Sequence, residues 1–382
     1  MKLGICTFGG DGGKSGISRY IVSLLQQFES LASDMTIDVM VYKSELDVFL
    51  PAGSKKLRPI EFPDSLKPPV RNIFWHQASL PGLCRREGYD VMFLPAANRR
   101  SALRLPCPMV GTVHDFSSIH VAGKYDPSRM FYIRQVLPFL IRRLDHVLTV
   151  SESSRRDIIS YARVPAERVT VTPLAADHGV YFPGDVEAAR RAVGEKYKIR
   201  APYVLYTSRL EHPGKNHVRL IQAFDQLKTR ENLPHQLVLA GSDWSGSEEV
   251  HKAASAARHS ADICFPGFVA GGDLPALYRG AEAFIFPSLF EGFGLPILEA
   301  MACGTATACS NLSSMPEVAG DAAPTFDPYD VDAIASVLGK LLTDDAWRAK
   351  CRQGGIERAL QFNWKRTAEA TLSALRSAAS KH

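Results

Sequence analysis

The chain has 382 residues, of which 46% are hydrophobic and 22% are charged, values typical of a globular protein with enough core for two or three domains. No apolar run approaches the ~20 residues that a membrane-spanning helix needs. The N-terminus leads directly into a strand-like run, so we also expect no signal peptide. Seven scattered cysteines without a C-x-x-C pair argue against a zinc site and favour reduced thiols in a cytoplasmic protein.

The net charge of +5 is unevenly distributed along the chain. Residues 1–180 carry 23 Lys and Arg against 17 Asp and Glu, a net of +6, whereas the remaining residues carry a net of −1. A basic first half suits an anionic partner such as a lipid-linked phosphate or a membrane surface. An ordinary solvated surface explains the same excess, and the charge count alone leaves both interpretations open.

The chain opens with a predicted strand at residues 2–8, a glycine-rich loop at residues 9–16 and an amphipathic helix over residues 17–31. Strand, glycine loop and helix in this order are the start of a Rossmann-like domain. The loop ends in Gly-Lys-Ser, as a Walker A motif does. However, the earlier glycine of that motif is replaced by Phe8, so we reject a nucleoside triphosphatase.

Four further strands are predicted in the first half, at residues 36–42, 89–94, 109–113 and 146–150, with a last one at 169–173. Residues 51–82 are rich in proline, glycine and lysine and are predicted to be a loop region. Residues 130–144 are predicted to form one apolar helix flanked by arginines. This helix lies either in the core or against a membrane or an anionic acceptor.

His114 and Asp115 follow the predicted strand 109–113 directly. Ligands of open α/β sheets bind at the carboxyl ends of strands, which makes the pair a candidate site. A lone histidine at such a position is more often structural. Farther along, Ser151 is expected to cap the helix after strand 146–150.

The second half begins with the same kind of unit, a strand at residues 203–207 followed by a loop and a helix. Arg209 and Lys215 bracket this loop at the carboxyl end of the strand. An Arg there can hold a diphosphate bidentately and a Lys can hold it as a point charge, although either alone is typical of a solvated surface. Two such units predict two Rossmann-like domains that face each other across a cleft. Later elements are predicted as strands at 236–240, 263–265 and 305–309, and as helices near 329–342, 345–361 and 364–380.

Residues 283–304 contain a third strand, loop and helix in close succession. Residues 283–286 form an apolar strand, Pro296 suits a helix start and Gly304 suits its end. The helix start offers N–H groups to an anion. Glu291 and Glu299, in the loop and in the expected first turn, are suited to hydroxyl groups of a sugar or ribose, or else Glu299 complements the helix dipole and Glu291 is a solvated charge.

The sequence from Glu291 to Glu299, with Glu-Gly-Phe-Gly-Leu-Pro inside it, resembles the E-x7-E signature of retaining glycosyltransferase family 4. Residues 301–305 and 313–323 also match that family's pattern. The resemblance implies the α/β GT-B fold, with an acceptor-binding domain at 1–180, a donor-binding domain at 181–363 and a final helix at 364–382 that packs back on the first domain. One departure is Leu-Ala-Ala-Asp at residues 174–177, where the family usually carries Asn-Gly or His-Gly.

The resemblance also implies roles for particular residues. Arg209 and Lys215 would hold the donor diphosphate, Glu291 the sugar hydroxyls and Glu299 the ribose, while His114 would contact the transferred sugar after domain closure. The N–H groups around Gly294 would replace a metal, so no metal and no cofactor are expected. The remaining predicted ligand contacts are Gly292, Phe293 and Leu295 in the same loop, Phe268 and Val269 beside the nucleobase, and Gly10 and Gly16 in the first glycine loop.

The implied activity is a retaining, metal-independent transfer of a hexose from a nucleotide diphosphate, with GDP-mannose as the first choice and UDP- or dTDP-sugars behind it. Similarity to bacterial mannosyl- and rhamnosyl-transferases implies a polyprenyl-diphosphate-linked saccharide acceptor in surface polysaccharide synthesis. We expect a cytoplasmic protein with peripheral contact to the inner membrane and no nucleic-acid partner. A nucleotide-sugar epimerase and a non-catalytic nucleotide-sugar or lipid-binding subunit are the alternatives, and product formation separates the three.

Overall fold

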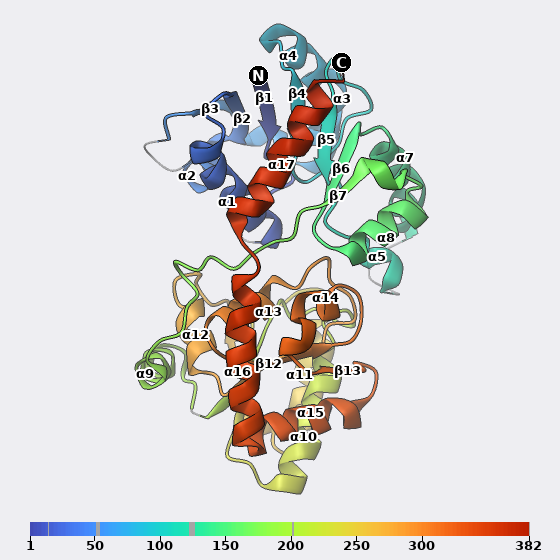
Figure 1. Ribbon diagram of the computed structural model, residues 1–382. Coiled ribbons are helices and arrows are strands. Elements are labelled where there is room, and N and C mark those ends of the chain that lie inside the picture. The colour runs from blue at the N-terminus through green and yellow to red at the C-terminus, as the bar shows by residue number, and fades with distance from the viewer. Residues whose placement is uncertain (14, 51–53, 122–126, 201, 382) are drawn as a thin grey trace. The chain divides into compact units, whose positions relative to one another are not determined.

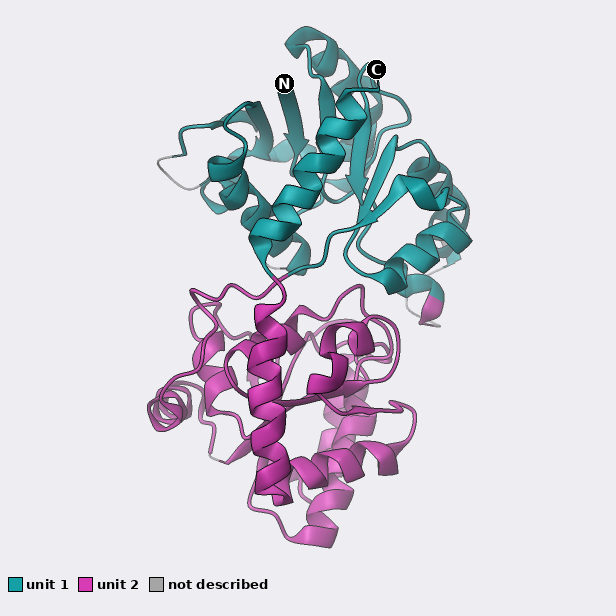
Figure 2. Cartoon of the chain, in the orientation of Figure 1, with its two compact units in different colours: residues 1–119, 125–174, 363–382 teal, residues 120–124, 175–362 magenta. Residues whose placement is uncertain are grey.

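The structure is a computed structural model that describes residues 1–13, 15–50, 54–121, 127–200 and 202–381. The chain divides into two units (Figure 2). Unit 1 comprises residues 1–119, 125–174 and 363–382, and unit 2 comprises residues 120–124 and 175–362. The sequence prediction of paired Rossmann-like α/β domains is confirmed, because each unit contains its own parallel sheet flanked by helices.

Unit 1 is built on a parallel sheet with the strand order β3-β2-β1-β4-β5-β6-β7 (Figure 1). The strands are β1 Lys2–Cys6, β2 Thr36–Tyr42, β3 Leu57–Phe62, β4 Val91–Leu94, β5 Met109–Thr112, β6 His146–Thr149 and β7 Val169–Val171. The central strands are buried along almost their whole length, as strands covered on both faces must be. This explains why they appear in the sequence as unbroken apolar runs.

The helices of unit 1 follow the strands in the alternating order of a Rossmann-like domain. Their bounds are α1 Gly16–Leu31, α2 Leu46–Phe49, α3 Pro69–Ala78, α4 Leu80–Glu87, α5 Ser117–His120, α6 Pro127–Phe131, α7 Leu137–Arg142, α8 Glu152–Tyr161 and α17 Trp364–Ala379. The apolar stripe of α1 is buried as its spacing predicts. Ser151 caps α8 by accepting a hydrogen bond from the backbone N–H of Ser154 over 3.0 Å, which confirms the predicted cap.

One prediction for unit 1 was wrong, and another was incomplete. Residues 51–82 contain β3, α3 and the start of α4, although residues 51–53 lie outside the described residues. β3 is an edge strand whose polar side chains are exposed, and it therefore tolerates Pro59 and lacks the apolar pattern of a buried strand. Residues 130–144 are helical as far as Arg142, as predicted, but the helix contains a π-helical turn at Tyr132–Val136 between α6 and α7. This turn comes just before Pro138, which has no N–H to continue the regular ladder.

Unit 2 is built on a second parallel sheet with the strand order β10-β9-β8-β11-β12-β13. The strands are β8 Tyr203–Thr207, β9 Gln236–Ala240, β10 Ile263–Gly267, β11 Ala283–Phe286, β12 Ala306–Ser310 and β13 Thr325–Phe326. The helices are α9 Val186–Tyr197, α10 His217–Glu231, α11 Ser247–Ala256, α12 Leu274–Gly280, α13 Leu295–Ala302, α14 Met315–Ala319, α15 Val331–Thr343 and α16 Asp345–Leu360. The helices predicted near 329–342 and 345–361 are α15 and α16.

The last helix, α17, belongs to unit 1, where it lies beside α1 and over β4, β5 and β6 (Figure 1). Its apolar face is buried there, and Thr367 donates a hydrogen bond to the carbonyl of Pro173 over 2.6 Å. Arg376 forms an ion pair with Asp34 at 2.9 Å. The helix is thus a structural part of unit 1 although the chain of unit 2 separates it from the rest.

Both sheets reverse their strand order at one point, between β1 and β4 in unit 1 and between β8 and β11 in unit 2. Loops that leave neighbouring strands in opposite directions leave a crevice at the carboxyl edge of the sheet, which is where such folds bind ligands. The loops that follow β1 and β4, and those that follow β8 and β11, are therefore the places to look for a site in each unit.

All seven cysteines are free thiols, and six of them are buried. No helix within the described residues combines the length and the apolar character required to cross a membrane.

Candidate functional site

The loop after β8 carries the first set of candidate residues in unit 2. It leaves the sheet at Ser208, whose N–H donates to the carbonyl of Ala240, and it ends at Asn216, the residue before α10. Asn216 has a φ of +60°, a left-handed conformation that asparagine adopts more readily than most residues. Arg209 and Lys215, which the sequence analysis selected, both lie in this loop.

The loop after β11 leads into α13, and its geometry confirms the predicted helix start and end. Gly294 precedes the helix with a φ of +98°, and a β-carbon there would lie 3.1 Å from the Ile297 side chain. Pro296 is the second helical residue, and Gly304 follows the helix with a φ of +75°. Glu299 is the fifth residue of α13 and so lies in its second turn, one turn later than expected.

The structure brings Lys215 and Glu291 together across these two loops. Nζ of Lys215 donates to Oε1 of Glu291 over 2.6 Å, and both side chains are mostly buried. A short, charge-assisted bond of this kind holds both groups in a fixed place. Two residues that were predicted separately, one for the diphosphate and one for the sugar, therefore form a single charged pair.

Backbone and side-chain hydrogen bonds fix the two loops to each other. The N–H of Leu289 donates to the carbonyl of Gly214 over 2.9 Å, and the amide of Asn216 donates to the carbonyls of Pro287 and Pro328 over 3.1 and 2.7 Å. Ser314 donates to the carbonyls of Glu291 and Phe293 over 3.0 and 2.8 Å. Because buried polar bonds of this kind specify one arrangement, the loops form a rigid frame for the Lys215–Glu291 pair.

Asn216 and Ser314 are supporting residues that the sequence analysis did not single out. A signal for each was present, since Asn216 follows Lys215 directly and Ser314 lies in the segment 313–323 that matches the family pattern. Neither signal indicated that these side chains hold the loops together, because their hydrogen-bond partners are distant in the sequence.

Arg209 is held differently from Lys215. Its guanidinium lies over the ring of Trp244, 4.7 Å from the ring centre, and 3.5 Å from Oε2 of Glu211. The side chain is half-exposed. Stacking on an aromatic ring keeps a guanidinium in place while it remains weakly hydrated and able to bind an oxyanion.

Glu299 is almost completely buried, with 2% of its surface exposed. Its Oε2 accepts a hydrogen bond from the phenol of Tyr278 over 2.9 Å, and the same phenol lies 2.8 Å from Oγ1 of Thr207 at the end of β8. The carboxylate is therefore oriented by Tyr278. Its predicted contact with a ribose stays a prediction.

The remaining predicted contacts of unit 2 differ in exposure. Phe268, after β10, is 67% exposed, whereas its neighbour Val269 is buried. Phe293 is buried with its ring edge-on to Phe362 at 5.8 Å, and Leu295 is buried at the start of α13. An exposed aromatic ring is suited to stack on a base, while the buried residues support the loop.

His114, the predicted sugar contact, lies in unit 1. It is buried at the end of β5, with Nε2 2.9 Å from the carbonyl of Pro95 and its ring edge-on to Tyr20 at 5.0 Å. Burial lowers the pKa of His114 to about 4, against which the bond to Pro95 acts only in part. The imidazole is thus neutral at pH 7, with its proton on Nε2, because a carbonyl can only accept.

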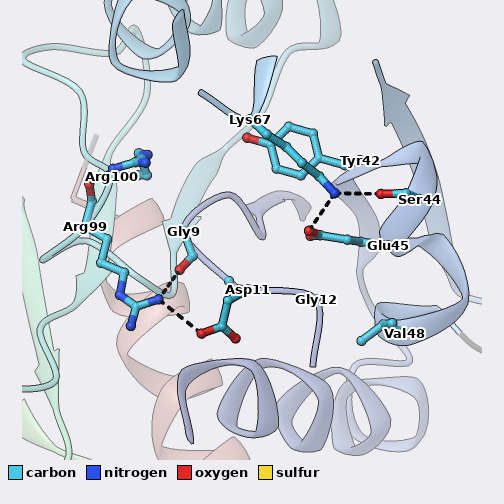
Figure 3. A pocket seen from close by; sticks show the side chains of 11 residues that line it. Gly9, Asp11, Gly12, Tyr42, Ser44, Glu45, Val48, Lys67, Arg99 and Arg100 are labelled. Carbon is cyan, nitrogen blue, oxygen red and sulfur yellow. Dashed lines mark hydrogen bonds and ion pairs between the residues drawn. The ribbon is translucent and has the colours of Figure 1, made fainter. Parts of the chain in front are cut away.

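The glycine loop after β1 forms one wall of a pocket of about 460 Å³ at the switch point of unit 1 (Figure 3). Gly10 lines this pocket, while Gly16 is the first residue of α1 and faces open space. Left-handed backbone at Gly9 and Gly12 shapes the wall, with φ values of +100° and +63°. Arg99 and Arg100, after β4, lie on one side of this loop, and Tyr42 of β2 lies on the other with Ser44, Glu45 and Lys67 (Figure 3).

No cluster of three or more His, Cys, Asp or Glu side chains suited to a metal occurs in the part of the chain that the structure describes. Cationic side chains at the two switch points include Arg209 and Lys215 in unit 2, and Arg99, Arg100 and Lys67 around the pocket of unit 1.

Comparisons with known proteins agree with this architecture. The family model "Glycosyl transferases group 1" matches residues 190–358, and the model "Glycosyltransferase Family 4" matches residues 14–179. The sucrose-phosphate synthase of Thermosynechococcus elongatus, at 19% identity, superposes with a TM-score of 0.76 over 100% of both chains, which shows the same fold.

Two curated relatives come from Escherichia coli. "O-antigen chain mannosyltransferase B" is 37% identical over 267 residues, covering 69% of each chain. "Serotype-specific mannosyltransferase WbdA" is 33% identical over 276 residues, covering 70% of this chain and 33% of that longer protein. The chain therefore belongs to the group 1 and family 4 glycosyltransferases, enzymes of the GT-B fold that transfer a sugar from a nucleotide-sugar donor to a saccharide acceptor.

Proposed function

We propose that this enzyme transfers mannose from GDP-mannose to a growing surface polysaccharide, with retention of the anomeric configuration and without a metal. The names of the two Escherichia coli relatives support mannose and a polysaccharide acceptor. The observation that carries the proposal is the Lys215–Glu291 pair at the switch point of unit 2, because it places a cation and a hydroxyl-binding carboxylate side by side. A nucleotide-diphosphate sugar presents that same combination of phosphate and hydroxyl groups.

In this proposal the bond between the anomeric carbon and the diphosphate oxygen breaks while the acceptor hydroxyl oxygen bonds to the same carbon. The acceptor proton passes to the departing diphosphate on the same face of the sugar. Lys215 stabilises the charge that develops on the diphosphate, together with Arg209 and the N–H groups at the start of α13. These fixed groups replace a divalent cation, which is why we propose metal independence.

Binding of the nucleotide displaces Lys215 from its pairing with Glu291 only in part. Lysine has three donor protons and can hold a phosphate oxygen while it keeps one bond to the carboxylate. Oε2 of Glu291 then accepts from a sugar hydroxyl. Glu299 accepts from the ribose, and Phe268 stacks on the base.

The proposed acceptor is a saccharide on a polyprenyl diphosphate, which would place the enzyme at the inner membrane. The basic excess of residues 1–180 supports an anionic carrier. The outer face of α3 supports a contact with the membrane, because Val70 and Phe74 are 80% and 70% exposed there beside Arg71. An exposed apolar face with a neighbouring cation is the composition that a membrane surface binds.

The test is product formation. Purified enzyme is incubated with GDP-mannose, a polyprenyl-diphosphate-linked saccharide and EDTA. The product is analysed by mass spectrometry and by the one-bond C1–H1 NMR coupling at the new anomeric centre. The proposal predicts an α-linked mannosyl product in EDTA. Transfer from UDP- or dTDP-sugars but not from GDP-mannose would contradict GDP-mannose as the donor. A β-linked product would contradict retention of the anomeric configuration.

A further inference from the structure

The loop that carries Glu291 also makes contacts outside the two loops of the candidate site. Serines before α14 hold its backbone, and the ring of Phe293 in the same loop packs against Phe362. Phe362 follows α16 and is the last residue of unit 2 before the chain returns to unit 1. The proposed reaction assigns no role to the residues at this end of α16.

The first connection from the loop leads to α14. Oγ of Ser313 donates to the carbonyl of Glu291 over 2.6 Å, and Oγ of Ser314 bonds to the carbonyls of Glu291 and Phe293. Ser314 is completely buried, so water does not compete for these bonds. The position of α14 therefore determines where the backbone of Glu291 lies.

Arg358 of α16 holds the other end of α14. Its Nε donates to the carbonyl of Val318 over 3.0 Å, and its Nη2 donates to the carbonyl of Glu317 over 2.6 Å. Carbonyls in the last turn of a helix lack intrahelical partners, and a guanidinium supplies the donors. A β-carbon on Gly320, which has a φ of +53°, would lie 3.1 Å from Nε of Arg358. Glycine at this position thus lets the guanidinium approach α14.

Phe362 connects the same end of α16 to the loop directly. The guanidinium of Arg358 lies 4.8 Å from the centre of the Phe362 ring. The ring of Phe293 meets the Phe362 ring edge-on, with 5.8 Å between the ring centres. Both arrangements are favourable, because an aromatic face attracts a cation and aromatic rings prefer edge-to-face packing. Nε2 of His178 donates to the carbonyl of Phe362 over 3.2 Å and so helps to hold its backbone in place.

We propose that Arg358 and Phe362 are positioning residues, which hold Glu291 in the orientation that binds the sugar of the donor. Arg358 acts through α14 and the serines before it, and Phe362 acts through Phe293. The two routes begin at one end of α16 and end on the same loop. The inference rests on the proposed function, because it extends the role that Glu291 has there.

A specific consequence follows for the binding of the donor. Glu291 binds hydroxyl groups of the sugar, whereas Arg209 and Lys215, in the loop after β8, bind the diphosphate. That loop is held separately by the amide of Asn216. Loss of Arg358 or Phe362 should therefore weaken the binding of GDP-mannose more than the binding of GDP, which has no sugar.

The first experiment is isothermal titration of GDP-mannose and of GDP, in EDTA, on the full chain. Phe362→Ala and Arg358→Gln are each expected to weaken GDP-mannose by about tenfold and GDP by less than about twofold. Phe362→Tyr keeps the ring and should bind both ligands as the wild type does. Leu360→Ala is the matched control, because it removes a side chain that is 62% exposed at the end of α16, and it should change neither affinity.

Far-UV circular dichroism and thermal melting show whether each variant is folded. Phe362→Leu keeps an apolar side chain and replaces Phe362→Ala if that variant does not fold. Folded Phe362 and Arg358 variants that bind GDP-mannose as the wild type does would overturn the proposal. An equal loss of GDP and GDP-mannose would also overturn it, since a general loosening of unit 2 affects both ligands.

The second experiment is a double-mutant cycle with Glu291→Gln. Residues that act through Glu291 have non-additive effects, because the second substitution has nothing left to disturb. Phe362→Ala should therefore weaken GDP-mannose by less than about twofold in a chain that already carries Glu291→Gln. Additive effects would show that Phe362 acts independently of Glu291 and would contradict the proposal.

The outcomes separate this inference from the proposed donor. If the wild type binds UDP and a UDP-sugar but neither GDP nor GDP-mannose, the proposed donor is wrong. The difference between the UDP-sugar and UDP then tests Arg358 and Phe362 in the same way.

Discussion

Both units have a candidate site at the point where the strand order of the sheet reverses. The two sites differ in whether their charged groups are paired. In unit 2, Lys215 and Glu291 neutralise each other at 2.6 Å, and the amide of Asn216 ties the loop after β8 to Pro287 in the loop after β11 and to Pro328 after β13. In unit 1, the switch point opens into a pocket where Arg100 Nε and Glu45 Oε2 have no partner within the described residues. The fold thus determines where a ligand binds in each unit. The charges at the site of unit 2 are already paired in the free protein, whereas the site of unit 1 has polar atoms that only a ligand would pair.

The largest expected effect comes from removing the cation of the preformed site. Lys215→Ala should lower the rate of transfer by about 10³-fold, because it removes a preorganised positive charge from the departing diphosphate. Steady-state kinetics with GDP-mannose measures this loss. Lys252→Ala, which removes an exposed lysine of α11, is the control and should keep the wild-type rate.

The rigid backbone of unit 2 offers the next test. A β-carbon on Gly241 would lie 1.9 Å from the carbonyl oxygen of Ser208, at the start of the loop that carries Arg209. Gly241→Ala should therefore lower the free energy of unfolding by about 3 kcal/mol, as measured by urea denaturation. Gly272→Ala is the control and should be neutral, because a β-carbon on Gly272 has no atom within 4 Å. Equal stability of the two variants would contradict the close packing of the loop that carries Arg209.

The buried histidine of unit 1 predicts a pH dependence. The pKa of His114 is about 4 in the folded protein because of burial, and near 6.5 in the unfolded chain, so the unfolded state binds more protons between these values. The stabilisation is complete above pH 6.5 and is lost as the pH falls toward 4. Between pH 7.5 and 5 this one group should lower the free energy of unfolding by about 2 kcal/mol.

The measurement for His114 is urea denaturation at both pH values for the wild type and for His114→Gln. Other groups titrate equally in both proteins, so the difference of the two pH dependences isolates His114. A variant with the same dependence as the wild type would show that His114 is already accessible to protons in the folded state.

The smallest expected effect concerns the orientation of Glu299. Tyr278→Phe removes the phenol that donates to Glu299 and should cost about 1 to 2 kcal/mol of unfolding free energy. If Glu299 holds the ribose, KM for GDP-mannose should rise as well. Tyr329→Phe, at an exposed tyrosine, is the matched control, and a Tyr278→Phe enzyme that shows neither change would remove this support for Glu299.

Much of the fold could be predicted from the sequence because its signals are local. Apolar runs predicted the central strands, and Pro296 and Gly304 predicted the bounds of α13 almost to the residue. β3 was missed because an edge strand can contain Pro59 and polar side chains. The π-helical turn at Tyr132–Val136 was missed because apolar content does not distinguish a regular helix from a π-helical turn.

The candidate site could be predicted in part for the same reason. Arg209, Lys215 and Glu291 follow strands in the sequence, but the Lys215–Glu291 bond joins residues 76 apart and becomes visible only in the fold. Arg100 and Glu45 gave no motif at all, since β4, β2 and the glycine loop bring them together at one edge of the sheet. Pairings that depend on strand order cannot be read from spacing along the chain.

The most direct test of the central claim, that the switch point of unit 2 holds a nucleotide diphosphate on Lys215 without a metal, is thermal stabilisation in EDTA. GDP, UDP, dTDP and ADP are compared on the wild type, Lys215→Ala and Lys252→Ala. The account predicts that GDP raises the melting temperature of the wild type and of Lys252→Ala more than the other nucleotides do, and that Lys215→Ala loses this rise. A wild type that no nucleotide stabilises in EDTA, or a Lys215→Ala protein that GDP stabilises fully, would contradict it.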